Sequence, residues 1–280
     1  MRHNHSLRLI MITNDIISAQ MADSVGIDYI MIDLELNGKV ARQGHLNTHI
    51  TNHVLEDIPK IKSIAKKSKI IVRINPLNVN SQVEIDQVIS LGADYIMLPM
   101  FSDSFEVEQF ITFVNGKVKT ILLLETAAAL ARLDYILDIK GIDAVYIGLN
   151  DLHMSMNLHF MFELLGGGLL DYIIPKINDK GIMCGFGGIA RIGEGALPSE
   201  YIIREHARLG SGMVILSRTF KDSLLGGSNN QEDKLYQEIS LIQEEYTTHL
   251  AMDSYAQATN REIIKNITRQ LVRQKQRLVT

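Results

Sequence analysis

The sequence has little cysteine and no long hydrophobic run. Its single cysteine, Cys184, excludes an internal disulfide and fits a reducing compartment. No apolar stretch reaches about 18 residues, so we expect no transmembrane helix. The first residues are not followed by a long apolar region with a small-residue cleavage site, so we expect no signal peptide. Together these absences favour a cytoplasmic protein.

The sequence also lacks a strong excess of either charge. Its formal net charge of −4 gives no reason to expect nucleic acid or a membrane as a partner. No G-x-G-x-x-G follows the first apolar run and no P-loop is present, so neither nucleotide-binding fingerprint applies. Apolar residues make up 46% of the chain, which is typical of a globular protein with an ample core.

Short apolar runs recur along residues 7–217, and segments of helical character separate most of them. We expect strands at Leu7–Ile12, Tyr29–Ile32, Ile70–Ile74, Tyr95–Leu98, Thr120–Leu124, Ala144–Ile147, Ile182–Gly185 and Met213–Leu216. This alternation is typical of βαβ units in an α/β protein with a parallel sheet. Eight units in a chain of this length predict a (β/α)8 TIM barrel, whose usual size is about 250 residues. A doubly wound open sheet is the alternative.

The same short phrase precedes three of the expected strands. It reads Gly26-Ile27-Asp28, Gly92-Ala93-Asp94 and Gly141-Ile142-Asp143. Glycine in this position serves as the left-handed cap of a helix. The aspartates stand at strand starts, which form the stabilising end of a barrel. We therefore interpret the repeat as structural.

Two consecutive strands in the middle of the chain each lead into a carboxylate. Glu125 follows Thr120–Leu124, and Asp151 follows Ala144–Ile147. Neighbouring strands lie about 5 Å apart, so the two like charges would face one site and need a cation between them. Carboxylates completed by water and substrate oxygens suit Mg²⁺ or Mn²⁺, whereas zinc favours His or Cys. Either carboxylate alone could instead be only a helix N-cap.

Further charged residues are expected at the same end of the barrel. Arg73 ends an apolar strand, where an unpaired charge would be costly, so it is either paired or facing a site. There it could hold an oxyanion with two hydrogen bonds. The glycine-rich stretch 185–191 and Arg218 could form an anion pocket, but a loop that needs positive φ explains the glycines equally well.

Three histidines spaced by four residues, His45, His49 and His53, follow the second strand in a polar segment. On a helix they would share a face, which allows a metal cluster. We favour a lid or a subunit contact, since no cysteine accompanies them. His45 is also a candidate catalytic acid or base.

A change in composition near residue 227 suggests two domains. The stretch Gly226–Asn230 reads as a linker between a barrel, residues 1–227, and a helical extension, residues 228–280. The extension is amphipathic and basic at its far end. We expect it to pack on a neighbouring subunit of a homo-oligomer. Nucleic acid is the less favoured partner, because no aromatic residues interleave the charges after Tyr255.

Five pieces of the sequence, taken in order, resemble the HpcH/HpaI aldolase and citrate lyase β-subunit family. They are Tyr29–Glu35, Val72–Asn75, Gly92–Pro99, Leu124–Thr126 and Ile147–Leu152. The resemblance implies a metal-dependent barrel that acts on 2-oxo acids or acyl-CoA esters.

The resemblance also implies roles for matching positions. Glu125 and Asp151 correspond to the metal ligands, and Arg73 to the arginine that binds the substrate oxyanion. Asp33 corresponds to the acidic partner of the catalytic base. Backbone N–H groups at Asn150 and Asp151 would hold a substrate carboxylate.

The chain departs from the family pattern at several positions. Leu36 stands where aldolases of the family have His, and Leu123 stands where Gln is often found. The long loop between the fourth and fifth strands is missing, and His153 replaces the usual Ser. The general base is therefore open among His45, His153 and a metal-bound water.

These residues predict a divalent-metal-dependent carbon–carbon lyase or aldolase that acts on a small 2-oxo or hydroxy-oxo acid. The metal and Arg73 would stabilise the enolate formed on cleavage. No lysine stands at a strand end in a setting suited to a Schiff base. The alternatives are an acyl-CoA lyase or condensing enzyme of the same family, and a barrel that binds a metabolite without catalysis.

Overall fold

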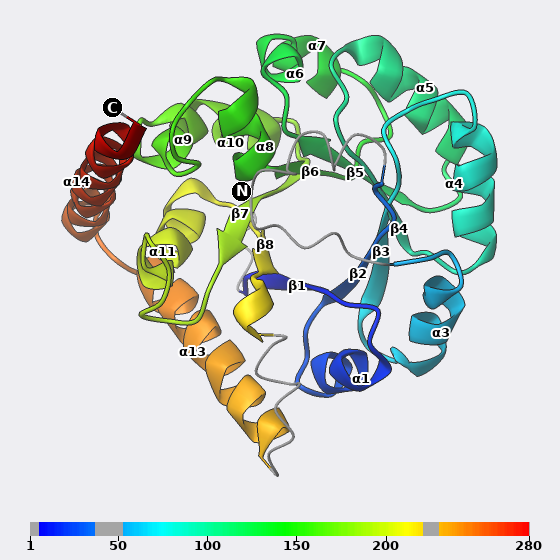
Figure 1. Cartoon of the computed structure of the whole chain (residues 1–280), viewed down its shortest axis with the longest axis horizontal. Helices are drawn as coiled ribbons and strands as arrows, with labels where there is room; N and C mark the ends of the chain where they lie inside the picture. Colours follow the sequence, from blue (N-terminus) through cyan, green and yellow to red (C-terminus); the bar gives the residue numbers. More distant parts are fainter. Residues whose placement is uncertain (1–5, 37–52, 221–229, 280) are drawn as a thin grey trace.

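The computed structural model describes residues 6–36, 53–220 and 230–279, and it confirms the predicted TIM barrel. Eight parallel strands close into a ring in chain order, with helices around the outside (Figure 1). The strands are β1 (Arg8–Ile12), β2 (Tyr29–Asp33), β3 (Lys69–Arg73), β4 (Tyr95–Leu98), β5 (Lys119–Leu124), β6 (Ala144–Ile147), β7 (Met183–Ile189) and β8 (Met213–Leu216).

The helices separate the strands, as the alternation in the sequence predicts. Residues 127–139, one of the segments of helical character, form two short helices that meet at Arg132. The helices are α1 (Ile16–Ser24), α3 (Asp57–Ile64), α4 (Ser81–Ser90), α5 (Ser104–Val114), α6 (Ala127–Ala131), α7 (Leu133–Leu137), α8 (Leu149–Ser155), α9 (Glu163–Gly166), α10 (Leu169–Asp179) and α11 (Ser199–Leu209).

Apolar side chains on both faces of the strands explain the continuous apolar runs. Successive strand residues point to opposite faces of the sheet. One set fills the barrel interior and includes Ile10, Met31, Ile71 and Met97. The other set packs between the strands and the surrounding helices. A parallel strand is therefore buried on both sides, and this is why its sequence does not alternate between apolar and polar residues.

The Gly-x-Asp repeat ties the strands together at their N-terminal ends. Its glycines have φ values of +87°, +104° and +95°, as expected for left-handed caps. Asp28 accepts a hydrogen bond from the Leu9 N–H at 2.9 Å. Asp94 and Asp143 do the same for the N–H groups of Ile70 and Thr120, at 2.8 and 2.9 Å. Each aspartate thus holds the strand before its own, which supports a structural role.

The seventh strand differs from the expected one, because it continues through the glycine-rich stretch to Ile189. A bulge interrupts its pairing with β8 between Gly185 and Gly188. The Tyr146 hydroxyl donates to the Gly187 carbonyl and accepts the Ile215 N–H at 2.8 Å. A side chain from β6 thereby supplies hydrogen bonds that the β7–β8 ladder lacks at this point.

Two helices follow the barrel, α13 (Gln231–Leu250) and α14 (Ser254–Val279), drawn in orange and red in Figure 1. The first packs on α11, and the second packs on α9 and α11. Gly166 allows the close approach of α14, because a Cβ there would lie 3.0 Å from Thr268 Oγ1. The expected boundary at residues 227 and 228 lies outside the described residues. Within the described ranges, no helix has the length and apolarity needed to cross a membrane.

The Tyr146 hydroxyl bridges the bulge between β7 and β8, and its removal tests how much this bridge stabilises the barrel. Replacing Tyr146 with Phe leaves the part-buried Ile215 N–H and Gly187 carbonyl without their partner, which we expect to cost about 1–3 kcal/mol in the free energy of unfolding. Urea denaturation followed by circular dichroism measures it. The control is Tyr135→Phe, at an exposed tyrosine on α7. Equal stability of the two variants would contradict the bridging role.

Candidate active site

Side-chain alternation along the strands brings three charged residues into the barrel mouth. Met31, Ile71 and Leu123 belong to the cluster that fills the barrel interior. Two residues further along each strand, on the same face, come Asp33, Arg73 and Glu125. These side chains therefore form the top of the inner core, at the C-terminal ends of the strands, where active sites of such barrels lie.

Arg73 is held by two carboxylates. Its Nε and Nη2 donate to the two oxygens of Asp33, both at 2.8 Å, across the β2–β3 pair in which these residues are register partners. Its Nη1 lies 3.2 Å from Glu35 Oε2. Burial lowers the pKa of the Arg73 guanidinium, but Asp33, Glu35 and Glu125 together raise it above its ordinary value. The arginine is thus permanently charged and fixed in orientation.

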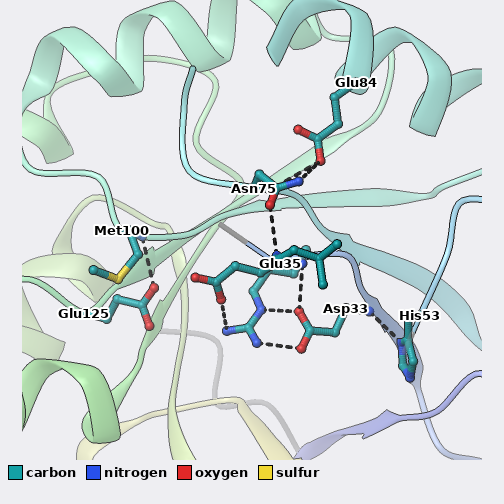
Figure 2. Close-up of polar contacts among 9 residues, drawn as sticks. Asp33, Glu35, His53, Asn75, Glu84, Met100 and Glu125 are labelled. Atoms are coloured by element: carbon teal, nitrogen blue, oxygen red, sulfur yellow. Dashed lines mark hydrogen bonds and ion pairs between the residues drawn. The ribbon is translucent and has the colours of Figure 1, made fainter. Parts of the chain in front are cut away.

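Glu125 is a buried carboxyl group with only 2% of its surface exposed. Its Oε1 accepts the Met100 N–H at 3.0 Å (Figure 2). Burial raises the pKa of Glu125 to about 8, and Asp151 and Glu35 add to the rise, against the opposing effects of Arg73 and the Met100 N–H. Asp151 thus acts electrostatically on Glu125, and a cation held between the two carboxylates stays a prediction.

The chain turns around Glu125 in a way that fixes its carboxyl group. Met100 adopts a left-handed conformation with φ of +55°, which is uncommon for a residue other than glycine. Thr126 caps α6 by accepting the Ala129 N–H, and its hydroxyl donates to the Phe101 carbonyl at 2.8 Å. The loops after β4 and β5 are thereby tied together on either side of Glu125.

Gly148 provides the space that Glu125 occupies. The Gly148 N–H donates to the Leu124 carbonyl at 3.0 Å, which continues the β5–β6 ladder into the start of α8. A Cβ at this position would lie 2.9 Å from Glu125 Oε2. Asn150 and Asp151 follow in the first turn of α8. The absence of a side chain at residue 148 therefore leaves room for the Glu125 carboxylate.

Glu125 and Asp151 offer a donor set that fits a hard divalent cation. Both provide carboxylate oxygens, the ligands that Mg²⁺ and Mn²⁺ prefer. A cation between them would offset the repulsion that contributes to the raised pKa of Glu125. In the part of the chain that the structure describes, no group of three or more His, Cys, Asp or Glu side chains could hold a metal. The remaining coordination positions would belong to substrate and water.

The predicted histidine cluster lies mostly outside the described residues. His45 and His49 lie outside the described residues. His53 is buried, and its Nδ1 accepts the Asp33 N–H at 2.9 Å. His153 has Nδ1 3.3 Å from the Leu149 carbonyl one turn earlier in its own helix.

The two arginines near the glycine-rich stretch do not form an anion pocket among the described contacts. Arg191 pairs with Glu238 of α13 at 2.9 Å and donates to the Thr219 carbonyl at 2.9 Å. It therefore fastens α13 to the barrel. Arg218 is exposed.

Glu35 is the site residue to which sequence reasoning gave no role. It stands two residues after Asp33, and the alternation that turns Asp33 inward could have identified it.

The sequence pattern of the HpcH/HpaI aldolase/citrate lyase family matches residues 11–161, more than half of the chain. The chain belongs to this family. The matched region runs from β1 to the segment before α9, and it contains Asp33, Arg73, Glu125 and Asp151. The family expected from the five sequence pieces is thereby confirmed.

Two aldolases are similar to this chain. A 2-keto-3-deoxy-L-rhamnonate aldolase of Shigella dysenteriae is 24% identical over 207 residues, covering 61% of this chain and 70% of that protein. A 4-hydroxy-2-oxo-heptane-1,7-dioate aldolase of Salmonella typhimurium is 24% identical over 170 residues, covering 50% of this chain and 59% of that protein.

Solved structures share the fold. An HpcH/HpaI aldolase/citrate lyase family protein from Burkholderia cenocepacia has a TM-score of 0.60 at 14% identity, covering 77% of this chain and 90% of its own. The citrate synthase SbnG has a TM-score of 0.59 at 18% identity, with coverage of 83% and 95%. At such identities the likeness establishes the barrel fold only.

We expect Gly148→Ala to displace Glu125 and to lower divalent-metal affinity at least tenfold, because the new methyl group collides with the carboxylate. Titration calorimetry with Mn²⁺ measures it. Gly188→Ala is the matched control, since a Cβ there would meet only the Ile215 carbonyl at an ordinary 3.5 Å. Unchanged affinity in Gly148→Ala would refute the close packing.

We expect the stability of chelator-treated protein to depend on the ionisation of Glu125. Its folded-state pKa of about 8 exceeds the ordinary value of 4.5, so the folded protein holds an extra proton between these values. The contribution of this group therefore falls as pH rises through that range, by up to about 1.4 kcal/mol per pH unit. Urea denaturation of the native sequence and Glu125→Gln, compared across that range, isolates the slope. If the free energies of unfolding of the two proteins change with pH in parallel, the expected contribution of Glu125 is absent.

Proposed function

We propose that this chain is a divalent-metal-dependent aldolase or lyase, which cleaves a carbon–carbon bond in a small 2-oxo acid. The observation that carries the proposal is the arrangement at the barrel mouth. A fixed guanidinium, Arg73, lies within electrostatic reach of Glu125, and Glu125 is itself coupled to Asp151. Such a site offers positive charge from two directions to an oxygen that becomes negative during cleavage.

Each residue has a distinct role in the proposed reaction. Glu125 and Asp151 would hold Mg²⁺ or Mn²⁺. The bound cation would supply Lewis acidity toward the substrate oxygens. Arg73 donates hydrogen bonds to the oxygen that gains charge, and Asp33 keeps the guanidinium in place through two hydrogen bonds. By family resemblance, the backbone N–H groups of Asn150 and Asp151 hold the substrate carboxylate.

The names of the two relatives support the substrate class. Both are aldolases whose names include a keto or oxo group. We therefore expect a hydroxy-oxo acid as substrate, with a short 2-oxo acid and an aldehyde as products.

A second candidate is an acyl-CoA lyase or condensing enzyme of the same family. The observation that favours it is the position of Leu36, where aldolases of the family carry His. Leucine brings no polar group to position 36, and the residue is 54% exposed. Turnover of a thioester with no cleavage of hydroxy-oxo acids would select this candidate.

Assembly into a homo-oligomer through the C-terminal helices also belongs to the proposal. Tyr236 and Leu241 on α13 are large apolar residues with at least half of their surface exposed. Light scattering after size-exclusion chromatography tests it, and a monomer at micromolar concentration would contradict it.

We expect EDTA to abolish retro-aldol cleavage and Mg²⁺ or Mn²⁺ to restore it. Glu125→Gln should lower kcat by at least about 10²–10³-fold, because the site loses a charged ligand. A coupled assay of 2-oxo acid release across a panel of hydroxy-oxo acids measures both effects. The control Glu108→Gln changes an exposed glutamate on α5 and should keep full activity. Activity that survives both chelation and Glu125→Gln would disprove the proposed chemistry.

A further inference from the structure

Leu36, which stands at the family position for a histidine, is 54% exposed. The Leu36 N–H donates to Asn75 Oδ1 at 3.0 Å, and Asn75 in turn donates to Glu84 of α4 at 2.9 Å. These hydrogen bonds fix the backbone at residue 36. Because its side chain is apolar and mostly exposed, proton transfer at this point of the site must come from another group.

Glu35 lies where such a group is needed. It has the same inward phase as Asp33, and only 2% of its surface is exposed. Its carboxylate contacts Nη1 of Arg73, whereas Asp33 holds Nε and Nη2. Figure 2 shows the Glu35 carboxylate on the side of this ion-pair group that faces Glu125, and Asp33 on the other side.

The second carboxylate is costly for the fold. Asp33 already forms a bidentate pair with Arg73, which satisfies one edge of the guanidinium. Burial of a further charge carries a desolvation penalty, and Glu35 also helps to raise the pKa of Glu125. Glu35 therefore places a second buried carboxylate on the same guanidinium, on the side of the ion-pair group that faces Glu125.

The Nδ1 atoms of the two candidate histidines in the described residues, His53 and His153, lie beside backbone groups. Nδ1 of His53 accepts a backbone N–H, so that nitrogen carries no proton to donate and no lone pair to offer a substrate. Nδ1 of His153 lies beside the Leu149 carbonyl of its own helix.

We propose that Glu35 is the residue that moves the proton in the reaction, an assignment that rests on the proposed aldolase function. The Glu35 carboxylate takes the proton from the substrate hydroxyl. The O–H electron pair forms the new aldehyde C=O, and the pair of the breaking carbon–carbon bond passes to the 2-oxo acid half as an enolate. Protonated Glu35 then returns the same proton to the enolate carbon. The 2-oxo acid is released and the carboxylate is regenerated.

The second half of this sequence can be tested without the aldol substrate. Removal and return of a proton at C3 of pyruvate exchanges its methyl hydrogens with deuterium from D₂O, which proton NMR follows. With Mg²⁺ present, we expect the native protein to catalyse exchange. We expect Glu35→Gln to slow it by about 10²–10⁴-fold, the usual contribution of a general acid–base group.

A binding measurement separates catalysis from structure. The Gln amide oxygen can still accept the Arg73 hydrogen bond, so the Kd for pyruvate with Mg²⁺, measured by calorimetry, should change by less than about threefold. Asp33→Asn should weaken pyruvate binding itself, since it loosens Arg73. The matched control is Glu108→Gln, at an exposed glutamate on α5, which should exchange at the native rate.

The outcomes separate the two proposals. Native exchange together with unchanged exchange in Glu35→Gln overturns the role of Glu35 alone. An absence of both pyruvate binding and exchange in the native protein overturns the aldolase function and, with it, this role. If Glu35→Gln does not fold, Glu35→Asp replaces it, because it keeps the charge and withdraws the carboxylate by one methylene. It should exchange more slowly than native, and native-rate exchange in Glu35→Asp would contradict the assignment.

Discussion

The ion pair between Arg73 and Asp33 is the interaction on which the site depends. It joins the ends of β2 and β3 at the point where these strands are in register. An unpaired guanidinium at this depth would carry a large desolvation cost, so the pair must form for the barrel mouth to close over its core. Once formed, it fixes a permanent positive charge at the centre of the mouth. Glu35 and Glu125 are then placed relative to that charge.

Carboxylates at the N-terminal ends of the strands support the fold, and those at the C-terminal ends form the candidate site. At the N-terminal end, Asp28, Asp94 and Asp143 each bind a backbone N–H of the preceding strand. Their carboxylates are thus directed at the scaffold. At the opposite end, carboxylates gather around a single arginine and are coupled electrostatically. The same residue type has opposite functions because one set caps strand starts and the other follows strand ends.

Most of the fold could be predicted from sequence, whereas the site could be predicted only in part. The eight apolar runs mark the strands, because burial on both faces leaves a strong local signal. The place of Glu125 follows from the same strand phase. The bulge in β7 could not be predicted, since it depends on the Tyr146 hydroxyl reaching a strand that is remote in sequence. Glu35 shares the inward strand phase of Asp33 and could have been identified from it, whereas its contact with Arg73, which is distant along the chain, could not.

The hydrogen bond from Met100 to Glu125 has a consequence for how the site can change in evolution. Its donor is a peptide N–H, which no side-chain substitution other than one to proline can remove. The amino acid at position 100 can therefore change while the hydrogen bond to the Glu125 carboxyl group remains. The restriction falls on backbone shape instead, because φ of +55° admits Gly or Asn readily and resists β-branched residues. The hydrogen bond to Glu125 thus depends on the backbone torsion angle at position 100 rather than on the side chain there.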